Sequence, residues 1–132
     1  MKKALSIKRL IKSFGYAFSG LKKAYLEEPN MKIHITMSIL VIICGIIFKV
    51  SRLEWIILLF AIGLVISAEL HNTAIENLTD LITKDFNQEA GKIKDVAASF
   101  VLVLAIIAAI IGLIIFVPKL LSLLEALKCM II

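Results

Sequence analysis

Three long apolar stretches dominate the pattern of hydrophobic and polar positions along this chain of 132 residues. They cover about residues 33–50, 54–82 and 94–117, and about 20 apolar residues are needed to cross a bilayer core. The third stretch is long enough by itself, the first is marginal, and the second crosses only if its helix continues past Glu69 into polar sequence. The pattern predicts an all-α membrane protein with three transmembrane helices in a single domain, residues 1–132.

The segments that flank these stretches have different patterns. In residues 4–27, apolar residues recur at helical spacing between lysines and one arginine, as in an amphipathic helix that lies in the membrane interface. Pro29 predicts a turn from this surface helix into the first span, because the residue before a proline disfavours helix. Residues 83–95 are polar and contain Gly91, which predicts a loop; the third helix then begins with Asp95 near its N-terminus, where the helix dipole favours a carboxylate.

Composition and charge agree with a membrane location. The chain is 61% hydrophobic with a mean hydropathy of +1.00, and a soluble domain of this size could not bury that much apolar surface. Eleven of the fifteen basic residues fall in the N-terminal segment and in residues 83–94, which predicts a cytoplasmic N-terminus. The net charge of +5 predicts attraction to anionic lipids. Nucleic-acid binding is not expected, since the basic residues are not interleaved with aromatic residues on a soluble face.

A polar stripe follows the apolar part of the second stretch, within the sequence AELHNTAIENLTDL at residues 68–81. At about 100° per residue, five side chains fall within roughly a third of the helix circumference. These are Glu69, Asn72, Thr73, Glu76 and Asp80. Counting from Trp55 places Glu69 inside the apolar boundary, Glu76 at the interface and Asp80 in water. A charged group at the depth of Glu69 costs about 2.5 to 3.5 kcal/mol, so the stripe indicates a functional site.

Carboxylates at a membrane boundary suit Mg²⁺, which prefers a few carboxylate oxygens together with phosphates. Glu28, beside the turn at Pro29, and Glu76 are candidate ligands, while Glu69 lies about 10 Å deeper, at the level of a lipid hydroxyl. A metal, nearby cations and a base are the requirements of phosphoryl transfer. Two other interpretations stay open from the residues alone: ion pairs that join helices or subunits, and ion or proton transport. Motifs such as Walker A, HExxH and GxSxG are absent from the sequence.

The segment Ala68–Asp80, AELHNTAIENLTD, resembles the signature E-x-x-N-[ST]-A-I-E-x-x-x-D of the small prokaryotic diacylglycerol kinase family. Further matches are Glu28 and the pairs Gly15-Tyr16, Gly20-Leu21, Lys94-Asp95 and Ala97-Ala98. The stretches 54–60 and 111–120 are similar to the Gram-positive branch, whose members resemble undecaprenol kinases. The resemblance implies a homotrimer in a bacterial plasma membrane that phosphorylates a lipid alcohol with Mg²⁺ and ATP. Undecaprenol is the expected alcohol, and diacylglycerol is the alternative.

The resemblance also implies roles for individual residues. Glu69 would be the general base and contact the lipid, and Glu28 and Glu76 would hold the metal. The residues that would contact ATP are Arg9, Tyr16, Glu28, Asn72, Glu76, Lys94 and Asp95, with Asp80, Asp85 and Asn87 as looser matches. Ala98 is a looser match to a substrate contact. His34 stands where the family has a carboxylate, and we interpret it as an interfacial histidine.

Overall fold

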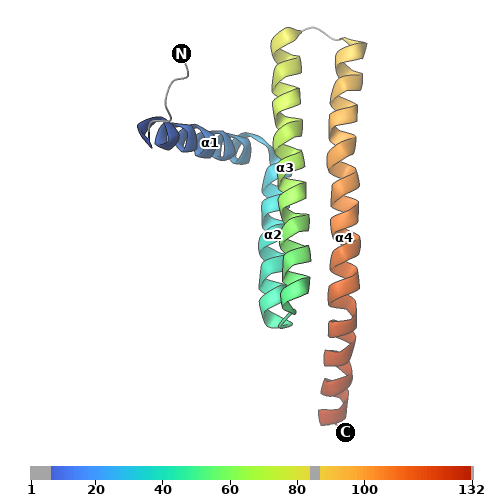
Figure 1. The fold of residues 1–132 in the computed structure, drawn as a ribbon. Helices are drawn as coiled ribbons and strands as arrows, with labels where there is room; N and C mark the ends of the chain where they lie inside the picture. The colour runs from blue at the N-terminus through green and yellow to red at the C-terminus, as the bar shows by residue number, and fades with distance from the viewer. Residues whose placement is uncertain (1–6, 84–86, 132) are drawn as a thin grey trace.

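The computed structural model describes residues 7–83 and 87–131 as four helices, and these residues contain no strand. The helices are α1 (Ile7–Glu27), α2 (Pro29–Ile47), α3 (Arg52–Ile82) and α4 (Gln88–Ile131). In Figure 1, α2, α3 and α4 run side by side, while α1 lies across their direction. α3 packs mainly against α4 and less against α2. α2, α3 and α4 are each long and apolar enough to cross a membrane, which confirms the predicted three-span architecture.

α1 is amphipathic, as predicted, and packs on the rest of the chain only near its C-terminal end. Ala24 is its one buried residue, whereas Leu10, Phe14 and Phe18 are exposed. An apolar face that no other part of the chain covers is suited to the headgroup and acyl boundary of a bilayer. Figure 1 shows that α3 and α4 continue past the level of α1.

α2 begins and ends at recognisable backbone signals. Glu28 has extended dihedrals (φ −99°, ψ 117°) and Pro29 occupies the first helical turn, where the missing N–H of proline costs nothing. The helix ends at Ile47, three residues before the predicted end at 50. The reason is that Lys49 adopts a left-handed conformation (φ 48°) and the Val50 N–H bonds to the Gly45 carbonyl at 3.1 Å. This closes the helix with a Schellman-type turn.

α3 begins with a capping box that holds the tight turn predicted for residues 49–54. The Ser51 side chain accepts a hydrogen bond from the Glu54 N–H at 3.3 Å, and Glu54 Oε2 accepts one from the Ser51 N–H at 2.6 Å. Glu54 Oε1 also lies 3.2 Å from Lys119 Nζ on α4. The cap therefore starts α3 and links it to α4 at the same point.

α4 is longer at both ends than the predicted span at 94–117. Asn87 Oδ1 accepts hydrogen bonds from the backbone N–H groups of Glu89 (2.9 Å) and Ala90 (3.2 Å), so an N-cap starts the helix at Gln88. The prediction of a loop through residue 95 was wrong, and Asp95 lies two turns inside the helix. At the other end α4 continues through Pro118 to Ile131, because the leucine-rich segment that follows favours helix.

The α2–α3 end of the bundle contains a close contact that the apolar pattern alone does not reveal. Val50, Leu58 and Ile115 form a buried cluster there, with Trp55 packed against it. A Cβ atom added at Gly45 would lie 2.7 Å from Cη2 of the Trp55 ring. Glycine is therefore needed at this position for α2 to approach α3.

We expect Gly45→Ala to destabilise the protein by about 1 to 3 kcal/mol, the usual cost of overpacking a close contact. The measurement is the free energy of unfolding in detergent micelles, followed by helical circular dichroism. Gly63→Ala is the matched control, because a Cβ atom at Gly63 meets nothing within 4 Å and alanine favours helix. Equal loss of stability in the two variants would contradict the Trp55 contact.

Candidate active site

The polar stripe predicted on α3 is present, and its central side chains are buried. Glu69 has an exposed fraction of 2%, Asn72 of 5% and Thr73 of 8%. Glu69 is the only charged side chain among the described residues that is buried to this extent. Glu28, at the junction of α1 and α2, interacts electrostatically with Glu69, which places Glu69 beside that junction.

Three carboxylates gather around this junction. Glu28 and Glu76, both partly buried, are the charged groups close enough to Glu69 to interact with it electrostatically. Across residues 7–83 and 87–131, no lysine, arginine or histidine forms an ion pair with any of the three. Like charges this close repel one another unless a cation or a proton is present. The cluster is therefore suited to bind a cation.

The carboxylates of this cluster suit a metal ion that takes most of its ligands from a nucleotide and from water. No group of three or more His, Cys, Asp or Glu side chains within the described residues is placed to hold a metal ion. Two carboxylates, Glu28 and Glu76, remain as possible ligands. Mg²⁺ is usually bound by one or two carboxylates together with phosphate oxygens and water. The carboxylates of this site therefore fit Mg²⁺ that arrives with a nucleotide.

Asn72 fixes the orientation of one of these carboxylates. Its Nδ2 donates a hydrogen bond to Glu76 Oε1 at 2.8 Å, while Asn72 Oδ1 and Thr73 Oγ1 are buried without a hydrogen-bond partner in the described part of the chain. Leaving a buried polar atom unpaired costs about 1 to 3 kcal/mol. Such atoms need an explanation, and a functional site is a common one.

Lys94 and Asp80, both predicted to lie near the nucleotide, form an ion pair with each other between α4 and α3. An exposed ion pair contributes only about 0 to 1 kcal/mol, so Lys94 can exchange this partner for a phosphate at little cost. Asp95 and Ala98 are exposed on α4, and Asn87 acts as the N-cap described above. Asp85 lies outside the described residues.

The structure does not bring Arg9 and Tyr16 to the carboxylates of the same chain. Both side chains are exposed on α1. At 1.5 Å per residue, Tyr16 lies about 18 Å and Arg9 about 28 Å along the helix from Glu28. His34 is partly buried in α2, and its carbonyl accepts a hydrogen bond from Ser38 Oγ at 2.7 Å. Among the described residues, no hydrogen bond or ion pair joins its ring to the three carboxylates.

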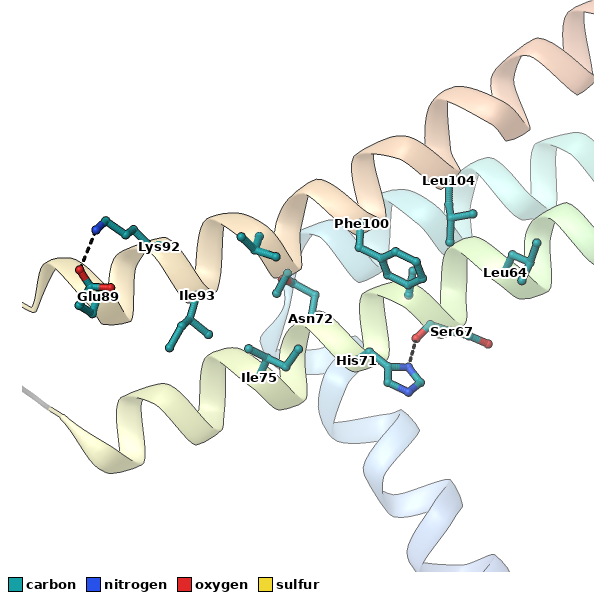
Figure 2. A pocket seen from close by; sticks show the side chains of 13 residues that line it. Leu64, Ser67, His71, Asn72, Ile75, Glu89, Lys92, Ile93, Phe100 and Leu104 are labelled. Carbon is teal, nitrogen blue, oxygen red and sulfur yellow. Dashed lines mark hydrogen bonds and ion pairs between the residues drawn. The ribbon is translucent and has the colours of Figure 1, made fainter.

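A groove of about 690 Å³ lies between α3 and α4 (Figure 2). Its walls are mostly apolar, and its polar lining residues are Ser67, His71, Asn72, Glu89 and Lys92. His71 Nδ1 lies 2.7 Å from the Ser67 carbonyl oxygen, and Lys92 Nζ lies 2.6 Å from Glu89 Oε1. No role was predicted for His71 from the sequence. The signal that could have identified it is its position two residues after Glu69, which places the imidazole outside the carboxylate stripe.

Comparisons with known proteins agree on one family. Residues 15–116 match the family model for prokaryotic diacylglycerol kinase. The chain is 43% identical over 114 residues to an undecaprenol kinase of Bacillus subtilis, covering 86% of this chain and 93% of the relative. It is 36% identical over 115 residues to a diacylglycerol kinase of Synechocystis, covering 86% of this chain and 66% of the relative. It is 28% identical over 102 residues to a diacylglycerol kinase of Escherichia coli, covering 77% and 84%. The chain therefore belongs to the prokaryotic diacylglycerol kinase family of lipid kinases.

Proposed function

We propose that this protein is an undecaprenol kinase that uses ATP and Mg²⁺ to form undecaprenyl phosphate at the cytoplasmic surface of a bacterial plasma membrane. The observation that carries the proposal is the buried Glu69 beside Glu28 and Glu76, with no ion-paired cation among the described residues. The choice of undecaprenol rests on the relative of Bacillus subtilis that carries this activity in its name.

Glu69 is the proposed general base. It lies seven residues before Glu76, or about 10 Å deeper along α3, at the level where a lipid hydroxyl meets the apolar core. The carboxylate has no hydrogen bond or ion pair within the described residues, so its oxygens are free to accept the proton of that hydroxyl. General-base catalysis requires such an acceptor within hydrogen-bond reach of the attacking group.

Glu28 and Glu76 are the proposed metal ligands. Mg²⁺ bound there with ATP would neutralise the charge that develops on the transferred phosphoryl group. Asn72 holds the Glu76 carboxylate through the 2.8 Å hydrogen bond, and Lys94 turns from Asp80 toward the phosphates. Asp95, Asn87, Asp85 and Ala98 are proposed to contact nucleotide or lipid from the family resemblance alone.

The position of α1 supports a homotrimer with shared sites. Because Arg9 and Tyr16 lie far along α1 from Glu28 of the same chain, the α1 helix of another copy is the natural source of their contacts to ATP. The basic residues of α1 would also meet anionic lipids of the cytoplasmic leaflet. The excess of lysine and arginine near the N-terminus supports a cytoplasmic position for this helix.

The test is transfer of radiolabelled phosphate from ATP by the purified protein in mixed micelles, with undecaprenol and diacylglycerol supplied at equal mole fraction. We expect Mg²⁺-dependent labelling, faster with undecaprenol. Faster labelling of diacylglycerol would contradict undecaprenol as the preferred substrate but would still support lipid kinase activity. No labelling of either lipid, together with ion flux in sealed vesicles, would overturn the kinase itself.

A further inference from the structure

The groove between α3 and α4 has the shape of a site for one lipid chain. Its lining runs along α4 from Glu89 to Leu104, which is about 22 Å at 1.5 Å per residue. Leu64, Phe100 and Leu104 line its apolar part, and Figure 2 shows them on facing sides of the two helices. One leaflet of the hydrocarbon core is about 15 Å thick. A groove of this length and direction suits an extended chain that runs parallel to the helices.

His71, an exposed residue that lines the groove, offers a hydrogen-bond acceptor to a lipid bound there. His71 Nδ1 lies 2.7 Å from the Ser67 carbonyl oxygen. A carbonyl oxygen only accepts hydrogen bonds, so Nδ1 carries the hydrogen and Nε2 of the neutral ring is an acceptor. Within the described part of the chain, Nε2 has no hydrogen-bond partner. A hydroxyl group at the end of an apolar chain could donate to this nitrogen.

The mouth of the groove favours a neutral head group over an anionic one. Lys92 and Glu89 are both exposed there and form an ion pair with each other at 2.6 Å. The two charges sum to zero, so the mouth of the groove carries no net charge from this pair. The choice of an alcohol therefore rests on His71, because an ionised phosphodiester has no hydrogen to donate to Nε2.

The groove meets the carboxylate cluster at Asn72, which lines the groove and donates to Glu76 Oε1, but His71 lies on a different face of α3 from Glu69. His71 follows Glu69 by two residues, which places the two side chains about 200° apart around α3 and about 3 Å apart in depth. A hydroxyl held by His71 thus lies at the level of Glu69 but on the opposite side of the helix. The groove can keep an alcohol at the depth of the reaction without exposing it to the base of the same chain.

We propose that the α3–α4 groove is a holding site for the lipid alcohol, with the apolar chain between the two helices and the hydroxyl donated to His71 Nε2. The identity of the alcohol as the kinase acceptor rests on the proposed function. The binding itself does not, because it depends only on the groove and the imidazole. It can therefore be measured without ATP.

The experiment uses a photoreactive prenol that carries a diazirine on its chain, with the full-length protein in nanodiscs and no nucleotide. Cross-linked peptides are identified by mass spectrometry. We expect labelling of the α4 segment that contains Phe100 and Leu104. His71→Leu should lower this labelling about 5-fold, to the level given by the matched hydrocarbon without a hydroxyl. His71→Gln, which keeps an acceptor, should retain more labelling than His71→Leu.

Leu64→Trp fills the groove and should reduce labelling of the same segment at least 5-fold. Leu59→Trp is the matched control, since Leu59 is exposed on α3 and is not among the groove-lining residues. The proposal is overturned if the hydrocarbon or a prenyl phosphate labels the segment as strongly as the alcohol. It is also overturned if Leu64→Trp changes nothing, or if a second copy of the chain is cross-linked in the groove instead of lipid.

The two proposals fail in different ways. If labelling depends on His71 but no alcohol is phosphorylated, the proposed kinase activity is wrong and alcohol binding in the groove is supported. If undecaprenol is phosphorylated but α4 is not labelled, alcohol binding in the groove is wrong and the proposed kinase activity is supported.

Discussion

Replacing Glu69 with glutamine should lower kcat by about 10²- to 10⁴-fold, the usual contribution of general-base catalysis, while ATP binding is retained. Glutamine keeps the size of the side chain but cannot accept the proton of the lipid hydroxyl. The measurement is the initial rate of lipid phosphorylation at saturating ATP and lipid, together with equilibrium binding of Mg²⁺ and ATP. The effect should fall on kcat, because Glu69 lies about 10 Å deeper than the proposed metal ligand Glu76.

Glu125→Gln is the control for Glu69→Gln, since it makes the same chemical change at an exposed position of α4. It should leave the rate unchanged. Removing a buried charge that lacks an ion-pair partner in the described residues should also leave the fold intact or stabilise it. A Glu69→Gln protein that is well folded and retains the wild-type rate would remove Glu69 from the role of base.

Replacing Glu76 with alanine should weaken Mg²⁺-dependent binding of ATP by at least about 100-fold. Removing a group that only supports a metal ligand usually lowers metal affinity or activity about 10- to 100-fold. Removing the ligand itself should cost at least as much. Asn72 is such a supporting group here, because it donates to Glu76 Oε1. Asn72→Ala should therefore give a smaller loss, within about 10- to 100-fold.

The measurement for Glu76→Ala is calorimetric titration of ATP at several Mg²⁺ concentrations. Glu89→Gln is a suitable control, as Glu89 is exposed and its only described ionic partner is Lys92. If Glu76→Ala leaves the Mg²⁺ dependence of ATP binding unchanged, the assignment of Glu76 as a metal ligand is wrong.

The parts of the fold that could be predicted from sequence are those set by local signals. Pro29 marks the start of α2, and the segment at residues 49–54 is too short to be anything but a tight turn. The spacing of the apolar residues predicts the long α3 with its polar stripe. The order of Glu69, Glu76 and Asp80 along that stripe depends only on the helix period and rise. These features needed no knowledge of the packing.

The parts that were missed depend on competition between signals or on packing. Asn87 caps α4 through two backbone hydrogen bonds, which overrides the loop character of the polar segment after it. The groove is lined by side chains of both α3 and α4, and a single sequence does not show how the two helices pack. For the same reason, no role was predicted for His71, although its spacing from Glu69 already places it on another face of α3.

Within the described residues, two ion pairs between α3 and α4 together limit the range of membrane thickness that the protein fits. Glu54 pairs with Lys119 at one end and Asp80 pairs with Lys94 at the other. These pairs are separated by 26 residues on α3 and 25 on α4, or about 38 Å along each helix. A hydrocarbon core of about 30 Å fits between them with about 8 Å to spare. Thicker membranes can thus be accommodated before either pair is drawn into lipid, and axial sliding of the helices would break both pairs at once.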